Sequence, residues 1–370
     1  MRLTQRKLSL GLLAVPTAIL MAMGLVFCWV TPANAYLYGP GSRFFFTRML
    51  CWAGIGCSLA TMAYLVGWRR WLKAAPIIAI GWVGLVMYAS TCPLVNGHWG
   101  WISVGCFRIN VLEFGPVVLS LFAAYLARVF NCKAFVVVGM ALLVIVGVVG
   151  YRAYCRQNRY EQSDLLPSQQ IVARDAHQTA YAFLQNQCAG AIRESKWFGS
   201  CDINLRLLPE STTTCMPASA SVLFGKWYLI MLAFALGMMG VGIGVAWRTS
   251  SAEPMRAYVL IWGGLVLIPC FLNILGCVGF APMFDFGIPF ACYGGTLVMS
   301  TMIGLAILAS QQGESASGQP LTCRDWAQAV VPVAAMVLVT LWGILSVSLR
   351  ENFTYLGAHE PHGQEEGGAK

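Results

Sequence analysis

Long apolar stretches alternate along the chain with short polar connections. Each stretch has roughly 20 residues, the length that an α-helix needs to cross the hydrocarbon core of a bilayer. We predict spans at 8–30, 47–67, 74–93, 111–130, 134–150, 222–247, 257–278, 289–310 and 327–349. Apolar and polar residues do not alternate with period two in them, which excludes a transmembrane β-barrel. The pattern predicts an all-α polytopic membrane protein of about nine transmembrane helices with one long extracytoplasmic segment.

These spans divide the chain into four parts. Residues 1–150 hold five N-terminal helices, and 151–221 form the extracytoplasmic region. Residues 222–310 hold three more helices, and 311–370 add a further helix and an outer tail. Within the extracytoplasmic region, 168–187 has the apolar spacing of a helix that lies on the membrane surface or folds back into the bundle.

Composition supports a membrane protein. Hydrophobic residues make up 58% of the 370 residues and charged residues only 11%, whereas a soluble domain carries about 25% charged residues. This ratio excludes an ordinary soluble enzyme, and we expect no nucleic-acid partner despite the net charge of +9.

The positive charges predict the orientation of the spans. With nine spans, the cations of the short connections fall on one side, which the positive-inside rule makes cytoplasmic. They are Arg2, Arg6, Lys7, Arg69, Arg70, Lys73, Arg128, Lys133, Arg248, Arg256 and Arg324. The N-terminus is then inside and the C-terminal tail outside. Ala33-Asn34-Ala35 resembles a signal-peptide cleavage site, but the apolar stretch before it is longer than a usual signal core, which favours a retained first helix.

Cysteines gather on the side predicted to be outside. Cys92 and Cys106 bracket one outer connection, and Cys277 and Cys292 flank another. The long outer segment holds four more, namely Cys155, Cys188, Cys201 and Cys215. An even set in an oxidising compartment suggests disulfides, with Cys92–Cys106 favoured and three connectivities open for the four. The alternative is that they are small buried hydrophobes. The absence of C-x-x-C argues against zinc, and we expect no metal site.

Motifs of soluble enzymes are missing from the sequence. There is no P-loop, no H-E-x-x-H and no G-x-S-x-G. The glycines of 240–244 lie inside a predicted span, so we expect them to permit close helix packing rather than to bind phosphate.

Three passages in order carry a family resemblance. The first runs from Val95-Asn96-Gly97 through Trp101 and Glu113 to Arg128, and the second from Gln187 through Leu208-Pro209-Glu210 to Gly225. The third contains Asn273, Pro282, Pro289-Phe290 and Tyr293-Gly294-Gly295. Together they resemble the SEDS family (shape, elongation, division and sporulation), the FtsW, RodA and SpoVE group. The resemblance covers most of the chain from about residue 45 to 310.

The resemblance implies a protein of peptidoglycan assembly in the bacterial cytoplasmic membrane. Similar proteins polymerise lipid II beside a class B penicillin-binding protein, a transpeptidase, or with other membrane proteins of the division or elongation machinery. Glycosyl transfer needs a carboxylate to deprotonate the acceptor, and cations or a metal to hold the departing pyrophosphate. No cofactor is required outright, but an active site would admit a divalent cation. The candidate substrate-binding residues are Asn96, Trp101 and Tyr293 in the resembling passages, and Arg193 and Lys196, which depart from the family pattern but would hold the pyrophosphate if the protein is active.

The sequence departs from the family where the chemistry lies. Thr214 stands where the family has its catalytic aspartate, and Thr212 where it has histidine. Trp99 and Gly100 replace a pair of arginines, and a helical hairpin is missing between 131 and 151.

These departures leave three hypotheses open. The favoured one is a scaffold of a wall-synthesis complex with an impaired or altered lipid II glycosyltransferase site. The second is an active, divergent glycosyltransferase in which Glu210, Asp202 or Glu113 supplies the carboxylate. The third is a flippase or transporter of a lipid-linked substrate. Structural roles compete for the same residues: Glu210 as an exposed loop acid, and Glu113 paired with Arg108.

A similar alternative holds for Arg193 and Lys196, which would simply face solvent in a turn. If the resemblance is right, the outer loop 94–110, the segment 208–225 and Pro289–Gly295 lie together around one cavity open to the outer leaflet.

Overall fold

A computed structural model describes most of the helical part of the chain. The described residues are 2–31, 37, 41–92, 100–105, 107–130, 183–200, 212–250, 252–281, 287–312 and 323–349. All statements below concern these residues.

The described chain is predominantly helical. Its long helices are α1 (Arg2–Val30), α3 (Phe44–Val66), α4 (Trp68–Thr91), α5 (Gly115–Val129), α9 (Trp227–Thr249), α10 (Glu253–Cys277), α11 (Gly295–Gln312) and α12 (Cys323–Leu349). Seven helical stretches among the described residues are long and apolar enough to cross a membrane, and α11 is a shorter apolar helix. The all-α polytopic class is confirmed. The predicted span 134–150 lies outside the described residues, so the count of about nine stays a prediction.

Two predicted spans had wrong boundaries. The span expected at 222–247 is broken at Gly225, whose φ of 99° separates α8 (Met216–Phe224) from α9. The span expected at 289–310 becomes helical only at Gly295, after a turn in which Phe290 has a φ of 68°. Both breaks occur among buried apolar residues, so hydrophobicity alone could not reveal them.

A small hairpin precedes α5 and was not predicted. Strands β1 (Trp101–Val104) and β2 (Phe107–Asn110) pair antiparallel, with Trp101 opposite Asn110. A 3-10 turn, η1 (Val111–Phe114), then leads into α5. The side chain of Asn110 caps this turn by accepting from the amide of Leu112.

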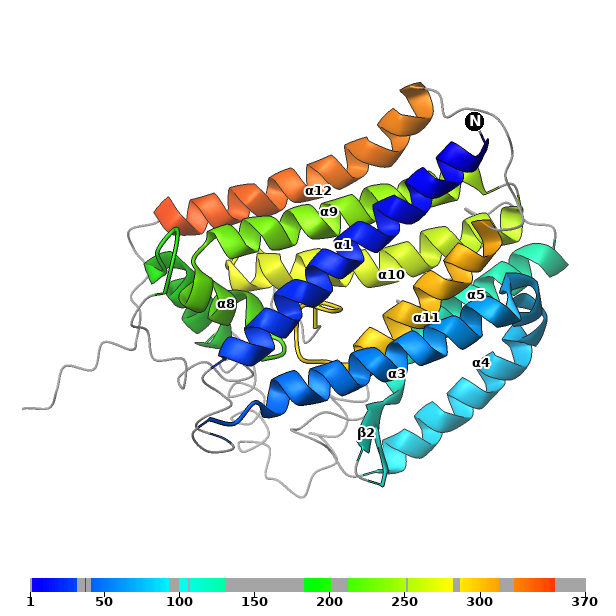
Figure 1. Ribbon diagram of the computed structural model, residues 1–370, viewed down its shortest axis with the longest axis horizontal. Helices are drawn as coiled ribbons and strands as arrows, with labels where there is room; N and C mark the ends of the chain where they lie inside the picture. Colours follow the sequence, from blue (N-terminus) through cyan, green and yellow to red (C-terminus); the bar gives the residue numbers. More distant parts are fainter. Residues whose placement is uncertain are drawn as a thin grey trace, which may run out of the picture.

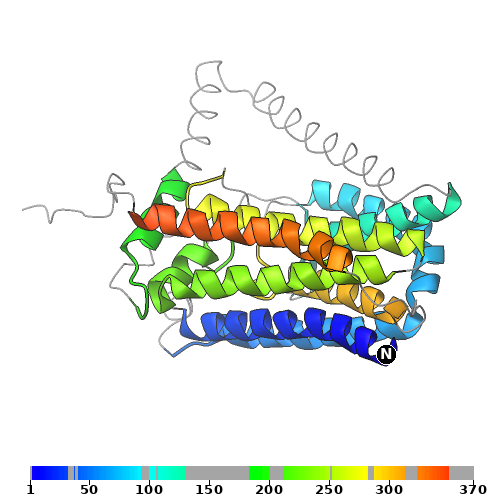
Figure 2. The same ribbon diagram turned by 90° about the horizontal axis from the view of Figure 1, so that it is seen from above.

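Helix α9 lies centrally in a bundle of roughly parallel and antiparallel helices, packed against α1, α10 and α12 (Figures 1 and 2). A Cβ placed on Gly244 would lie 2.9 Å from Cβ of Ala329 in α12. One placed on Gly242 would lie 2.7 Å from the carbonyl oxygen of Leu12 in α1. The predicted role of these glycines in close helix packing is therefore confirmed.

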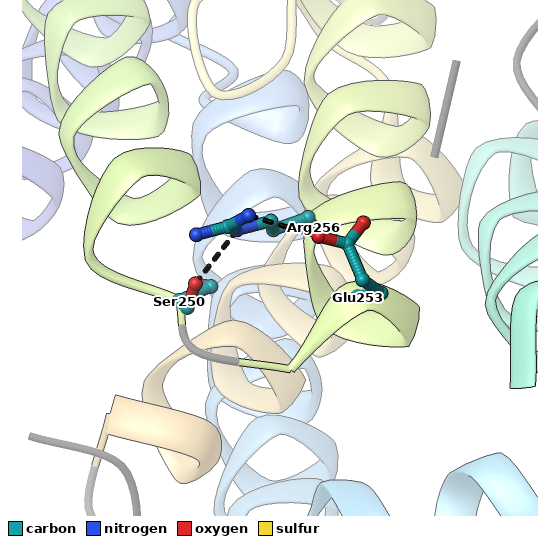
Figure 3. A network of polar contacts seen from close by, with 3 residues as sticks. All are labelled: Ser250, Glu253 and Arg256. Atoms are coloured by element: carbon teal, nitrogen blue, oxygen red, sulfur yellow. Dashed lines mark hydrogen bonds and ion pairs between the residues drawn. The ribbon is translucent and has the colours of Figure 1, made fainter. Parts of the chain in front are cut away.

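One end of the bundle collects the basic connections. Figure 1 shows that α1 and α4 begin, and α5 and α9 end, at this end of the molecule. Here Arg256 donates to the carboxylate of Glu253 at 2.9 Å and to the carbonyl of Ser250 at 2.8 Å (Figure 3). The Ser250 hydroxyl also bonds Gln311 of α11 at 3.2 Å. We call this the basic end; α8 lies at the opposite end.

Candidate functional site

A buried turn, 212–215, leads into α8 at the end opposite the basic end. Thr214 is only 4% exposed. Its carbonyl oxygen accepts a hydrogen bond from Nδ2 of Asn273 at 3.0 Å and a weak one from the thiol of Cys277 at 3.8 Å. Two residues of α10 therefore hold the turn that contains Thr214, the residue that the resemblance aligns with the family's aspartate.

The segment 287–294 lies against this turn. The amide of Tyr293 donates to the carbonyl of Thr212 at 2.9 Å. The ring of Tyr293 packs edge to face on Phe45 of α3, with centroids 4.9 Å apart. On another side, Gly24 of α1 approaches the carbonyl of Phe290 so closely that no side chain fits between them.

The hairpin joins the same group through the start of α11. The amide of Asn110 donates to the hydroxyl of Thr296 at 3.2 Å. Phe107 packs on Trp52 of α3 at 5.2 Å between ring centroids. Trp101, predicted to bind substrate, is half-buried in the strand opposite Asn110.

Glu113 follows the hairpin in η1, close to the same segment. It is half-buried, and one of its carboxylate oxygens is fully covered. Its carboxylate lies near enough to Cys292 to interact with that thiol electrostatically. Arg108, its suggested partner, has an exposed side chain in β2.

The described parts of the three passages are therefore linked through 287–294 and the start of α11. The turn 212–215 contacts 287–294 through Tyr293, and the hairpin contacts α11 through Thr296, three residues further on. That they enclose a cavity stays a prediction.

Arg193 and Lys196 lie at the end of the helical residues 183–194 and in the turn that follows, beside the start of α9. Arg193 is half-buried near the end of the helical residues 183–194, and Lys196 is exposed. The carbonyl of Lys196 accepts from the amide of Lys226 at 3.0 Å, and the carbonyl of Arg193 accepts from the Lys226 ammonium at 2.9 Å. A lysine near the end of a helix stabilises the carbonyls that the helix leaves open.

Lys226 is the residue that the sequence analysis missed. It is 5% exposed, and its ammonium also lies 5.4 Å from the ring centroid of Trp197. It was placed inside the predicted span 222–247. The adjacent Gly225 was the available signal, since a Gly-Lys pair inside an apolar stretch fits a turn better than a membrane-embedded helix.

Several predicted residues lie outside the described part of the chain. They are Asn96, Glu210, Asp202, Cys106, Cys155 and Cys201. Their proposed roles, including the favoured Cys92–Cys106 disulfide, stay predictions; Cys92 itself is half-buried at the end of α4.

Two other disulfide candidates, Cys188 and Cys215, come together with Cys277 in a buried apolar cluster. All three are 0% exposed. Contact with the thiols of Cys215 and Cys277, together with burial, raises the pKa of the Cys188 thiol well above its usual range. In this form the thiol stays protonated at neutral pH.

The described candidates offer limited acid–base chemistry. A threonine hydroxyl is far too weak a base to deprotonate an acceptor at neutral pH. Of the carboxylates proposed for catalysis, Glu113 alone lies in the described residues.

Comparisons with known proteins agree with this arrangement. The model of the cell cycle protein family FtsW/RodA/SpoVE matches residues 11–166. The probable peptidoglycan glycosyltransferase FtsW of Thioalkalivibrio sp. (strain K90mix) is 24% identical over an alignment of 366 residues, and the match covers 82% of this chain and 89% of that protein.

Two solved structures share the fold. A chain from a structure described as a peptidoglycan synthase complex that coordinates polymerisation and crosslinking has a TM-score of 0.60 at 15% identity, covering 82% of this chain and 97% of its own. A mutant of the rod shape determining protein RodA of Thermus thermophilus has a TM-score of 0.58 at 16% identity, with the same coverage.

Proposed function

This chain belongs to the SEDS family, the FtsW, RodA and SpoVE group, and we propose that it is a scaffold of a wall-synthesis complex whose lipid II glycosyltransferase site is impaired. It is a glycosyltransferase-like protein of peptidoglycan synthesis, multi-pass in the bacterial inner membrane. The scaffold role needs its own test.

The surroundings of Thr214 carry the proposal. Its carbonyl is held by Asn273 and Cys277, and the adjacent cluster consists of thiols and apolar side chains. Asn273 and the thiols are neutral, so these described groups provide neither a base for the acceptor hydroxyl nor a strong cation for the pyrophosphate.

A class B penicillin-binding protein is the partner that we propose. The similar fold in a peptidoglycan synthase complex supports this choice, because that complex coordinates polymerisation with crosslinking. The basic end supports an orientation with the N-terminus inside, which places α8 and the turn 212–215 at the outer surface, where lipid II would be met.

The alternative function is an active, divergent glycosyltransferase. One observation favours it: the half-buried carboxylate of Glu113 lies beside Cys292, within the group where the three passages meet. A carboxylate near the end of a membrane span is costly to maintain and is often functional.

Purified protein and labelled lipid II, with and without the transpeptidase, distinguish the two functions. We expect the wild-type chain to co-purify with the transpeptidase and to form no glycan polymer. Polymer formation by Thr214→Asp, with Thr214→Asn as a neutral control of similar size, tests whether the site lacks only a carboxylate.

The result that would overturn the scaffold function is polymer made by the wild-type chain and lost in Glu113→Gln. If the wild-type chain neither binds the transpeptidase nor forms polymer, both proposed functions are refuted. Gel filtration of each variant in detergent shows whether it folds.

A further inference from the structure

The three buried cysteines of the cluster come from three different elements. Cys188 lies in the helical residues 183–194, Cys215 precedes α8, and Cys277 is the last residue of α10. They are far apart in sequence, so their meeting is a property of the tertiary fold.

The positions of these cysteines rest on independent contacts. The thiol of Cys188 touches the thiols of both Cys215 and Cys277. Gln185, one helical turn before Cys188, donates to the carbonyls of Gly276 at 3.3 Å and Ala281 at 2.7 Å. These bonds hold residues 183–194 against the end of α10, on the face that carries Cys188.

We propose that Cys188 is joined by a disulfide to Cys215 or Cys277 in the mature protein, and that this bond fixes the turn containing Thr214. The proposal goes beyond the scaffold function but rests on the same orientation, which places the cluster on the oxidising side. Cys188 is the required member because its thiol contacts both of the others.

The chemistry is a two-electron oxidation. A thiolate of this chain attacks a disulfide of an extracytoplasmic protein oxidant and forms a mixed disulfide, releasing one thiolate of the oxidant. The second cysteine then displaces the other oxidant sulfur. One S–S bond forms here, one breaks in the oxidant, and the two protons of the thiols end on the reduced dithiol.

Burial determines when this can happen. The folded cluster excludes solvent, and the raised pKa of Cys188 leaves little thiolate to react. The bond must therefore form before residues 183–194 dock onto α10. Once formed, it should resist a reductant until the protein is unfolded.

Peptide mapping tests the proposal on the full chain. The protein is purified from membranes with an alkylating agent present, denatured without reductant, alkylated again and digested with trypsin. Arg193 and Arg206 place Cys188 and Cys215 in different peptides, and Arg256 separates both from Cys277. We expect a cross-linked peptide that contains Cys188, with Cys215 or Cys277 as its partner.

Two outcomes would overturn the proposal: alkylation of all three cysteines before reduction, or a Cys215–Cys277 bond that leaves Cys188 alkylated. Cys188→Ser should abolish the cross-linked peptide and lower the unfolding temperature. Cys270→Ser, a buried cysteine of α10 bonded to Val266 within its own helix, should preserve the cross-link.

The orientation is tested separately, so its failure can be told apart. Phe198 is 75% exposed at the same end as the cluster. In intact spheroplasts, a membrane-impermeant maleimide should label Phe198→Cys above the wild-type background. If Phe198→Cys is labelled but peptide mapping finds the cluster cysteines reduced, the disulfide alone is refuted. If Phe198→Cys is not labelled, the orientation on which both proposals rest is refuted.

Discussion

Replacing Gly24 by alanine tests the contact between α1 and the segment 287–294. A Cβ on Gly24 would lie 2.9 Å from the carbonyl carbon of Phe290 and 3.0 Å from Cα of Ala291, and closer still to the Phe290 oxygen. Backbone atoms cannot rotate away as a side chain can. Either α1 or the segment must therefore move.

Two opposing contributions set the size of the effect. Alanine in place of glycine stabilises a helix interior by about 1 kcal/mol. Overpacking costs about 1–3 kcal/mol, and rigid backbone on the far side favours the upper end. We expect Gly24→Ala to lower the free energy of unfolding by about 1–2 kcal/mol net, since the second contribution outweighs the first.

Gly11 provides the matched control in the same helix. No atom lies within 4 Å of its Cβ position, so Gly11→Ala should leave stability unchanged or raise it by up to about 1 kcal/mol. Thermal unfolding of both variants in one detergent, followed by tryptophan fluorescence, should show a drop of roughly 2–6 °C for Gly24→Ala only. Equal unfolding temperatures would refute the close approach of α1 to Phe290.

Three further substitutions test the turn and its neighbours by the same unfolding assay. Asn273→Leu removes the donor to the Thr214 carbonyl and should cost about 1–2 kcal/mol, because a buried acceptor loses its main partner. Lys226→Met keeps the aliphatic stem but removes the bond to the Arg193 carbonyl, at a cost of about 1–3 kcal/mol. Gly225→Ala forces a side chain into a positive φ and should cost at least about 1–3 kcal/mol.

Two substitutions serve as controls. Lys196→Met removes a neighbouring but exposed lysine, and Ser346→Ala removes a hydroxyl bonded within its own helix at 2.7 Å. Both should stay within about 0.5 kcal/mol of the wild type. If Lys226→Met behaves like Lys196→Met, the buried ammonium does not hold the turn.

The spans were predictable because a bilayer leaves the backbone little choice. A chain segment in hydrocarbon must satisfy its own hydrogen bonds, and a helix does so within one apolar stretch. The same argument failed at Gly225 and at 287–294. There the backbone bonds to other segments, such as Tyr293 to Thr212, and the surrounding residues are as apolar as those of a span.

The meeting of the three passages was predictable only through the family resemblance. Their contacts include bonds between backbone groups, which no side-chain pattern encodes, as in the bond from the Tyr293 amide to the Thr212 carbonyl. The contact of Cys277 with the other two thiols could not be predicted from the sequence either, because it depends on how residues 183–194 dock onto α10.

Thr214→Asp alone should restore little activity, for a reason that lies in its surroundings. An ionised carboxylate at a buried position is strongly destabilised unless a cation or several donors face it. The described side chains that bond the Thr214 carbonyl, those of Asn273 and Cys277, are neutral, and the family resemblance aligns Gly100 with an arginine. A new aspartate there would stay largely protonated at neutral pH and would be a poor base. We therefore expect Thr214→Asp to lose stability relative to Thr214→Asn at high pH, and polymer to require a restored cation as well. Polymer from Thr214→Asp by itself would show that only the acid is missing.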